Sequence, residues 1–533
     1  MLQIDPSTRV KLSWLLGALG LLVFFLIGID QSLLFDVDEG AFSEATREMF
    51  VSRDWWHTTL NGEDRFDKPI GVYWLQAISV SLFGITEFGF RFPSAMSAWL
   101  ASLALAKFSQ HLWGYRAAVL TALISATSLG PWAMSQTASA DALLSLFFVL
   151  TFLDLWRALT ARQVGPGRRV ALWMALGLLV KGPIALVLPF GSLFIFGLLD
   201  KQSRTRIFQL LKDPWSWFIL IAVALPWYVY AYFRHGQNFI DGFILKHNIE
   251  RFTGSMESHT GHWAYFLVAL PLLWLPWSPL LLRALFLLRS QWHQAFLKYC
   301  WVWCVFVLLF FSMASTKLPH YLLYAGPAVC LLITYSALSA NRRFWLVTWT
   351  CALIGFSVLL FLPEYLIQHS NVIKDPTYRL LIEDASSIEA KSWLFVIPLI
   401  FYIKLTVQKI IELFFKSEIR LTQGTGFIAF AIFQIVIVGF IVLPWWSRTL
   451  QSPVYELSMR MKNDPRRVVQ WGVHLPSFST YRQQSTPRRT PSVEELALVK
   501  NQSDHWTSDW EAIETKGPYS IVRSRAVSAP ALN

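Results

Sequence analysis

The stretch "IGVYWLQAISVSLFGIT", residues 70–86, decides how the rest of the chain is arranged. It is apolar, but it is shorter than the roughly 20 residues that a transmembrane helix needs. It also carries Gln76, Ser79 and Ser81 among its apolar residues. Whether it crosses a membrane or lies on the surface fixes the side on which every later loop falls.

Thirteen other stretches are strong candidates for membrane spans and predict an all-α polytopic membrane protein. They are Leu12–Leu34, Phe92–Gln110, Ala117–Trp132, Ala142–Leu159, Val170–Val180, Pro183–Leu199, Trp215–Phe233, Trp263–Leu287, Tyr299–Met313, Tyr321–Leu338, Phe344–Leu362, Ser392–Ile410 and Gly426–Trp446.

The composition of the 533 residues excludes the main alternatives to a membrane protein. Charged residues make up only 15% and hydrophobic residues 54%, whereas soluble domains have about 25% charged residues. The 41 Phe, 26 Trp and 16 Tyr also exclude a disordered chain. The net charge of +12 indicates basic cytoplasmic loops, and no nucleic-acid-binding module is visible.

The distribution of basic residues resolves the role of residues 70–86. If this stretch does not cross and the N-terminus is cytoplasmic, the basic residues of the short loops gather on the cytoplasmic side, as the positive-inside rule requires. Examples are Arg168, Arg169, Arg342 and Arg343. If it crosses, nearly all of them fall outside. We therefore interpret residues 70–86 as an interfacial amphipathic helix and expect the C-terminus outside.

This topology divides the chain into two parts. Residues 1–446 form the expected transmembrane domain, which includes a long first outer loop at residues 35–88. Residues 447–533 form an expected small outer α/β domain. Within it, "VVQWGVHLPSFSTYR" (468–482) alternates like strands around a turn, and "SVEELALVKN" (492–501) reads as a helix capped by Ser492.

The first outer loop begins with "FDVDEGAFSEATREMF", residues 35–50, in which Asp38 and Glu39 leave the membrane. A carboxylate at that depth is partly desolvated and can act as a general base, so both are catalytic candidates. The alternative is a surface helix whose N-terminal carboxylates interact with the helix dipole.

Further ionisable residues lie at the ends of spans on the same side. Asp67 and Lys68 begin the interfacial helix, and Lys68 either meets a phosphate or anchors the chain at the headgroups. Asp141 is either a functional carboxylate or an N-cap. Lys181 precedes a Gly-Pro turn that aims it inward, although an interface anchor is the alternative.

Two later outer segments add basic and imidazole groups. The segment "FILKHNIERF" (243–252) carries His247 and Arg251, and "STKLPHYLL" (315–323) carries Lys317 and Tyr321. With an acid from the first loop, His247 could bind a divalent cation, although a lone histidine is more often an ordinary polar residue. A mixed acid and base cluster on one face fits an anionic, lipid-linked substrate, with water, a hydroxyl or a phosphate as acceptor.

Six of these segments, in order, resemble the GT-C membrane glycosyltransferases that use polyprenyl-phosphate sugars. They are "DEGAFSEATREM", "FDKPIGVYWLQ…LFG", "ADALL", "VKGP", "KHNIERF" and "KLPHYLL". The likeness is greatest to the lipid A aminoarabinose transferases, which are related to protein O-mannosyltransferases. It implies about thirteen spans, juxtamembrane helices in the first periplasmic loop and a small periplasmic C-terminal domain, all in a bacterial inner membrane.

The resemblance also implies roles for individual residues. Asp38 takes the place of the family's catalytic carboxylate, and Asp67 and His247 match the positions implicated in metal binding. The resemblance places Lys68, Lys181, Lys317 and Tyr321 at the donor-phosphate site. Asp141 and Arg251, from the same cluster on the outer side, complete the expected donor-phosphate and substrate-binding set.

Three positions depart from the aminoarabinose transferases. This chain has Ala41 where they usually have Arg, Asp67 where they usually have Glu, and Lys246 where they often have Glu. The sugar and the acceptor therefore stay open.

The predicted activity is an inverting transfer of a sugar from a polyprenyl-phosphate donor to a periplasmic acceptor, with lipid A or a related glycolipid favoured. A divalent metal is a possible cofactor, and no nucleotide is expected at the site. The alternatives are a GT-C enzyme that acts on protein or another glycan, and a transporter or flippase for lipid-linked sugars. The absence of ionisable groups near mid-membrane and of a two-fold repeat disfavours transport.

Overall fold

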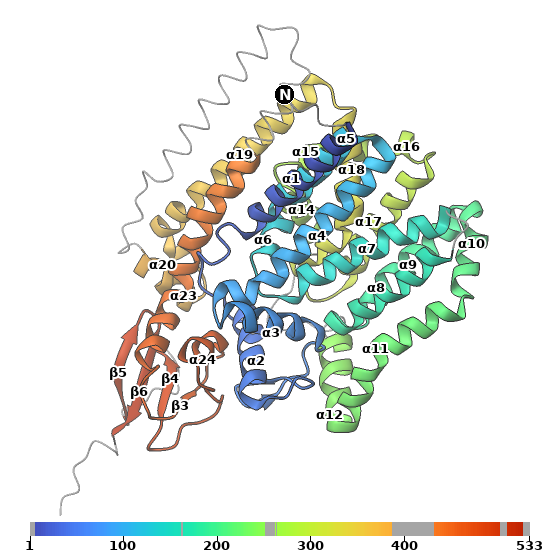
Figure 1. Cartoon of the computed structure of the whole chain (residues 1–533). Coiled ribbons are helices and arrows are strands. Elements are labelled where there is room, and N and C mark those ends of the chain that lie inside the picture. The colour runs from blue at the N-terminus through green and yellow to red at the C-terminus, as the bar shows by residue number, and fades with distance from the viewer. Residues whose placement is uncertain are drawn as a thin grey trace, which may run out of the picture.

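The computed structural model describes residues 6–160, 164–250, 262, 264–385, 431–501 and 509–525. The described chain is mainly helical, with a bundle of long helices above and a small sheet at one lower corner (Figure 1). The long helices of the bundle are α1 (Pro6–Leu26), α4 (Glu87–Trp113), α7 (Ala140–Thr160), α8 (Gly165–Lys181), α9 (Ile184–Leu199), α11 (Pro214–His235), α17 (Ala295–Met313), α18 (Gly326–Leu338) and α19 (Arg342–Gln368).

Six helical segments of the described chain are long and apolar enough to cross a membrane, and a bent pair raises the number to seven. The six are Ala140–Thr160, Pro214–His235, Ala295–Met313, Pro319–Leu338, Val347–Gln368 and Ala431–Arg460. The bent pair is α5 (Tyr115–Thr127) with α6 (Leu129–Ser135), which meet at 65°. These segments coincide with stretches expected to span, while Ser392–Ile410 lies outside the described residues.

One expected span is not a single helix. Residues 263–287 contain α14 (Tyr265–Leu273) and α15 (Ser278–Phe286), separated by turns at Trp274 and Trp277. Pro276 and Pro279 explain the break, because proline has no N–H to donate and its ring clashes with the preceding helical turn. The expected span is therefore broken into two helices in this structure.

Residues 70–86 form the short helix α3 (Gly71–Phe83), which lies below the bundle beside α2 (Asp38–Ser52) (Figure 1). Its 13 residues extend about 20 Å at 1.5 Å per residue, too short for a hydrocarbon core of about 30 Å. Ile78 and Leu82 are exposed on one face, while Tyr73 is buried on the other. A Cβ on Gly71 would lie 2.8 Å from the carbonyl oxygen of Leu179, so only glycine lets α3 start against the end of α8. The structure agrees with a helix that does not cross.

The lower surface of the bundle is completed by short elements. Strands β1 (Thr59–Leu60) and β2 (Glu63–Asp64) form an antiparallel hairpin between α2 and α3. Helix α11 continues through α12 (Gln237–Phe239) into the π-helix η1 (Ile240–Glu250). Of the predicted site residues, His247 lies in η1, and Asp67 and Lys68 follow the hairpin directly before α3.

The C-terminal part contains a four-stranded sheet in the order β3-β4-β6-β5. Its strands are β3 (Val468–Gln470), β4 (Leu496–Lys500), β5 (Trp510–Lys516) and β6 (Tyr519–Ser524); β3 and β4 are parallel and the other pairs antiparallel. Helix α23 (Leu443–Arg460) leads into it, and α24 (Pro476–Arg482) packs against α23.

Two local predictions for this part differ from the structure. Residues 476–482 are the helix α24 and not a strand. Residues 496–500 are the central strand β4 and not a helix, because Leu496 and Leu498 are fully buried between β3 and β6. The Ser492 N–H donates to Glu495 Oε2 at 2.9 Å, but no helix follows, so the expected helix cap is absent.

Helix α24 also lies against α2, far away in sequence (Figure 1). The Ser477 N–H donates to Asp36 Oδ1 at 2.9 Å, and the Ser477 hydroxyl donates to Asp36 Oδ2. A Cβ on Gly40 would lie 2.2 Å from Asp36 Oδ1 and 2.6 Å from the Ser477 nitrogen. A glycine in α2 therefore permits this close approach of the C-terminal part.

Candidate functional site

Two neighbouring cavities lie between α2, the loop that precedes α3, η1 and the bundle helices. The first, here called the lysine cavity, has a volume of about 480 Å³. It brings together the predicted residues Asp67, Lys68, Lys181, His247 and Tyr321. The rest of its wall is largely apolar and includes Ile184, Val187, Phe310 and Phe311. It can therefore hold an anionic head with an apolar tail.

The second cavity, here called the polar cavity, has a volume of about 220 Å³. Its wall is predominantly polar, and Asp38, Asn61, Arg65, His474 and Arg488 contribute to it. Asp67 and His247 line both cavities. These two residues therefore mark the boundary at which a group in one cavity would meet a group in the other.

Asp67 is the most highly connected carboxylate at this boundary. Its Oδ1 accepts a hydrogen bond from Lys68 Nζ at 2.6 Å and lies 3.1 Å from His247 Nδ1, while Oδ2 pairs with Arg65 at 2.9 Å. Burial alone would raise the pKa of Asp67, but Lys68 and His247 hold it well below its usual value. Asp67 is thus ionised, and the side chains of Lys68, His247 and Arg65 lie against it.

Lys181, at the end of α8, is held by two partners. Its Nζ donates to Asp141 Oδ1 at 2.6 Å and to the Tyr324 hydroxyl at 2.8 Å. The same Nζ lies 5.4 Å from the ring centre of Tyr321. The Asp141 side chain, on α7, therefore orients a lysine and does not cap its helix, the alternative that the sequence had left open.

Lys317 does not line either cavity. Its Nζ donates to the carbonyl oxygens of Ser312 and Ala314 at 2.6 Å and of Phe311 at 3.3 Å. Because the last carbonyls of a helix lack intrahelical partners, this contact caps the end of α17.

Asp38 and Glu39 are adjacent but have different surroundings. Asp38 begins α2 and is exposed at the polar cavity. Glu39 is buried and lines neither cavity; its Oε1 pairs with Arg91 Nε at 2.8 Å and accepts from the Ala138 N–H at 2.6 Å. Glu39, the second catalytic candidate, therefore links α2 to α4 through its ion pair with Arg91. Arg251, also predicted, lies outside the described residues.

Sequence reasoning missed several residues of the site. Arg65 directly precedes the segment that begins with Phe66, and Tyr324 directly follows the segment that ends with Leu323. Only their polar side chains could have indicated that they belong to the site. His474 and Arg488 come from the C-terminal part, more than 400 residues after Asp38, and no local pattern points to them. Burial lowers the pKa of His474 to about 4, so its imidazole is neutral at physiological pH.

Potential metal ligands occur in two places in the described part of the chain. Asp67 and His247 supply two donors, and the buried His247 Nδ1 lies 3.1 Å from Asp67 Oδ1. Within the described residues, the only cluster of three or more potential metal ligands lies elsewhere. It consists of His57, Asp64 and His235, whose donor atoms lie within 4.8 Å of one another.

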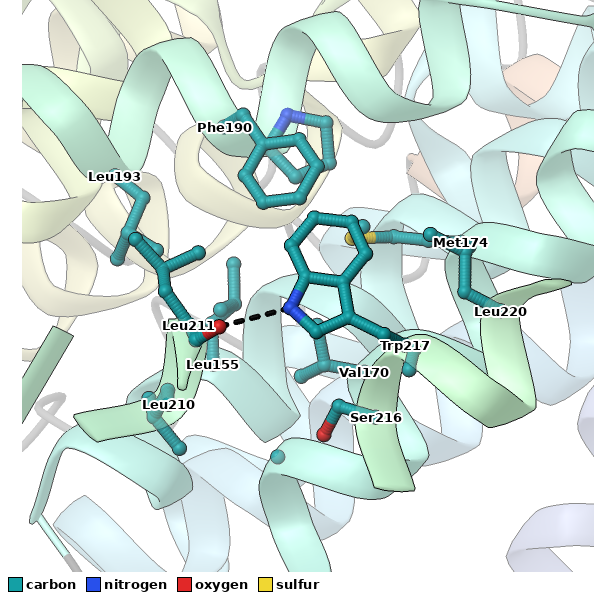
Figure 2. A pocket seen from close by; sticks show the side chains of 13 residues that line it. Leu155, Val170, Met174, Phe190, Leu193, Leu210, Leu211, Ser216, Trp217 and Leu220 are labelled. Atoms are coloured by element: carbon teal, nitrogen blue, oxygen red, sulfur yellow. Dashed lines mark hydrogen bonds between the residues drawn. The ribbon is translucent and has the colours of Figure 1, made fainter. Parts of the chain in front are cut away.

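A further, smaller cavity of about 60 Å³ lies between α7, α8, α9 and the start of α11. Figure 2 shows its apolar lining, with the Trp217 indole directed at the Leu211 carbonyl, to which it donates at 2.8 Å. No ionisable side chain lines it. It therefore lacks the groups that acid–base or phosphate chemistry requires.

Comparison with known proteins places this architecture in a family. The family described as dolichyl-phosphate-mannose-protein mannosyltransferase matches residues 67–232. The undecaprenyl phosphate-alpha-4-amino-4-deoxy-L-arabinose arabinosyl transferase of Aeromonas salmonicida is 31% identical over 370 residues, 66% of each chain. The corresponding transferase 2 of Proteus mirabilis is 29% identical over 349 residues, 62% of this chain and 61% of that protein. The chain thus matches slightly under two thirds of these relatives' length.

Solved structures extend the likeness to nearly the whole chain. ArnT from Cupriavidus metallidurans bound to undecaprenyl phosphate has a TM-score of 0.78 at 17% identity, covering 97% of this chain and 99% of that one. The apo state of ArnT from Cupriavidus metallidurans has a TM-score of 0.75 at 18% identity, covering 99% of this chain and 100% of that one. The fold is therefore of the GT-C type. In sequence and in fold the chain is similar to the aminoarabinose transferase-like GT-C membrane glycosyltransferases, the family that the six sequence segments indicated.

Proposed function

We propose that this protein transfers a sugar, with inversion, from a polyprenyl-phosphate donor to lipid A or a related glycolipid. The observation that carries the proposal is the junction of the two cavities at Asp67 and His247. One cavity combines lysines with an apolar wall, and the other combines Asp38 with arginines. A donor and an acceptor would meet at their boundary.

The lysine cavity is the proposed donor site. Lys68 and Lys181 supply positive charge for the phosphate, and Phe310, Phe311 and Ile184 supply apolar surface for the polyprenyl chain. Because Asp141 holds Lys181 in place, the charge is preorganised for the phosphate that departs as the leaving group. Tyr321 packs beside this lysine, and Arg251 and Lys317 stay in the proposed substrate-binding set.

Asp38 faces the polar cavity and is the proposed base. The acceptor oxygen attacks the anomeric carbon on the face opposite the phosphate; the new C–O bond forms as the bond to phosphate breaks, and the phosphate keeps the electron pair. If the acceptor is a hydroxyl, Asp38 takes its proton. If it is a phosphate, Asp38 orients the acceptor. Glu39 acts through Arg91 and is a positioning residue.

Arg65 and Arg488 favour an anionic acceptor such as a lipid A phosphate, because guanidinium groups bind phosphate oxygens bidentately. Asp67 and His247 would hold a divalent cation beside the donor phosphate. Such a cation would neutralise charge on the leaving phosphate. No nucleotide is part of the proposed site.

The membrane arrangement is also a proposal. Thirteen crossings place the N-terminus in the cytoplasm and both cavities in the periplasm. Residues 1–446 form the transmembrane domain, and residues 447–533 the periplasmic α/β domain. The short α3 and the C-terminal sheet support this arrangement.

The test is mass spectrometry of lipid A from a strain that lacks the gene, restored with the wild type, Asp38→Asn or Glu63→Gln. Glu63 is a carboxylate of the same polar cavity and serves as the matched control. We expect the wild type and Glu63→Gln to restore a sugar mass. Asp38→Asn should lower transfer by roughly 10²–10⁴-fold if a base is needed, with unchanged membrane insertion.

Unchanged lipid A would redirect the search to protein or other glycan acceptors. Full restoration by Asp38→Asn would contradict the role of Asp38 and favour transport of the lipid-linked sugar.

A further inference from the structure

A second group of ionisable side chains lies outside the lysine cavity. His57 follows α2, Asp64 ends the β1–β2 hairpin, and His235 is the last residue of α11. His57 Nε2 lies 2.9 Å from Asp64 Oδ1, and His235 Nδ1 lies 3.3 Å from Asp64 Oδ2. Donor atoms in a tetrahedral zinc site, with bonds of 2.0–2.1 Å, are about 3.3 Å apart. Each imidazole is therefore already about this far from an Asp64 oxygen, and the donor atoms of all three residues lie within 4.8 Å of one another.

The ligand types also fit a borderline transition metal. Two imidazoles and one carboxylate are a common three-residue set for zinc, which leaves a fourth position for water. The side chains of His57 and His235 are only 10% and 11% exposed, whereas Asp64 is 50% exposed. Solvent can thus reach the group from the carboxylate side.

The cluster of His57, Asp64 and His235 differs from Asp67 in its ion-pair partners. Asp67 pairs with Lys68 and Arg65, whereas no lysine or arginine pairs with Asp64 in the described part of the chain. His235 Nε2 is buried without a hydrogen-bond partner. A cation bound between the three side chains would supply positive charge beside the Asp64 carboxylate.

The backbone around the group is held by contacts that do not involve its three side chains. Arg234 pairs with Asp54 at 2.5 Å, and the Trp227 indole donates to the Trp56 carbonyl at 3.1 Å. These contacts fasten the segment before His57 to α11, and the hairpin fixes the position of Asp64. The group is therefore preorganised, as a metal site requires.

We propose that His57, Asp64 and His235 bind one divalent cation of the zinc type. The cation would fasten the loop between α2 and α3 to the outer end of α11. Asp64 also lines the polar cavity, but none of the three side chains is given a step in sugar transfer, and the test below measures metal binding and not transfer.

The test uses the full-length protein in detergent, stripped with a chelator and loaded with Co²⁺. The readouts are the visible d–d absorption and the ratio of bound cobalt to protein. We expect His57→Ala and His235→Ala each to lower bound cobalt by one equivalent with loss of the corresponding absorption. His293→Ala, an exposed histidine far along the chain, should leave both readouts unchanged. The double variant Asp67→Asn, His247→Ala should still bind the one equivalent of cobalt that is assigned to His57, Asp64 and His235.

Unchanged cobalt in both histidine variants would overturn the proposal, and so would an equal loss in the His293→Ala control. If a variant does not fold, the wild type provides a second measurement. Cobalt should protect His57 and His235 from modification by diethylpyrocarbonate, read by peptide mass spectrometry. Equal modification with and without cobalt would overturn the proposal without any variant.

Discussion

Asp38 and Glu39 show how adjacent carboxylates acquire different roles. Asp38 faces a polar cavity, where a substrate can reach it. Glu39 is 3% exposed and is surrounded by Arg91 and the Ala138 N–H. A carboxylate with these partners anchors the start of α2 and thereby fixes the direction in which Asp38 points.

We expect Glu39→Ala to lower the free energy of unfolding by about 3–5 kcal/mol, because it leaves the fully buried Arg91 without its counter-charge. Thermal denaturation in detergent measures the change. Glu494→Ala, at an exposed position of the C-terminal part, is the control and should change stability by less than about 0.5 kcal/mol. Similar melting temperatures for the two variants would show that the buried pair contributes little.

At the residue scale the sequence predicted part of the site. Lys68, Lys181, Asp67, His247 and Tyr321 were expected on one face of the membrane, and they do line one cavity. Helix ends on the same side must lie near one another, which is why this inference was possible. It could not reveal that Lys317 turns back onto the carbonyls of α17, because side-chain direction depends on tertiary packing.

At the scale of elements, the contact between α24 and the start of α2 depends on protonation. Burial raises the pKa of Asp36 to about 7, although its hydrogen bonds with Ser477 act in the opposite direction. The folded protein therefore binds a proton that the unfolded chain releases at a much lower pH. By linkage, the stability from this carboxyl is fully present below about pH 4 and is lost as the pH rises through 7.

We therefore expect the amides of residues 476–482 to be better protected from hydrogen exchange at pH 5.5 than at pH 8, after correction for intrinsic rates. Asp36→Asn removes the titration and should give the same protection at both values. The amides of β4, in the interior of the sheet, are the internal control. Equal protection of α24 in the wild type at both pH values would refute the dependence.

Elements were predictable where a single pattern dominated. Long apolar stretches became helices, and the short 70–86 stretch became a short helix, because both depend on local composition and length. Residues 492–501 satisfy a helix-cap pattern, and yet residues 496–500 form the strand β4. The burial of Leu496 and Leu498 between two strands outweighs the local preference there.

At the scale of the whole molecule, the polar cavity joins segments that are remote in sequence. Asp38 and Arg65 come from the first outer loop, His247 from η1, and His474 and Arg488 from the C-terminal part. Such contacts leave no trace in local periodicity, so the contribution of the C-terminal part could not be predicted. The family and the GT-C fold were predicted correctly, because six separate segments in one order carry more information than any one motif.

We expect Arg488→Gln to raise the KM for an anionic acceptor by roughly tenfold, equivalent to about 1.4 kcal/mol, with little change in the KM for the donor. The physical reason is the loss of one guanidinium from the polar cavity while the lysine cavity is unchanged. Arg489→Gln is a matched neighbour, because Arg489 pairs with Glu495 at 2.6 Å and lines neither cavity. Steady-state kinetics with the purified protein distinguishes the two. An equal rise in both KM values would place Arg488 outside the acceptor site.

The docking of α24 and Arg488 against the first outer loop has a consequence for biosynthesis. The ribosome makes Asp38 early and Arg488 more than 400 residues later. A nascent chain that has already inserted its helices still lacks one wall of the polar cavity. The complete cavity forms only after the last segment has been made and has folded back onto the first, so synthesis itself delays the moment at which the site is assembled.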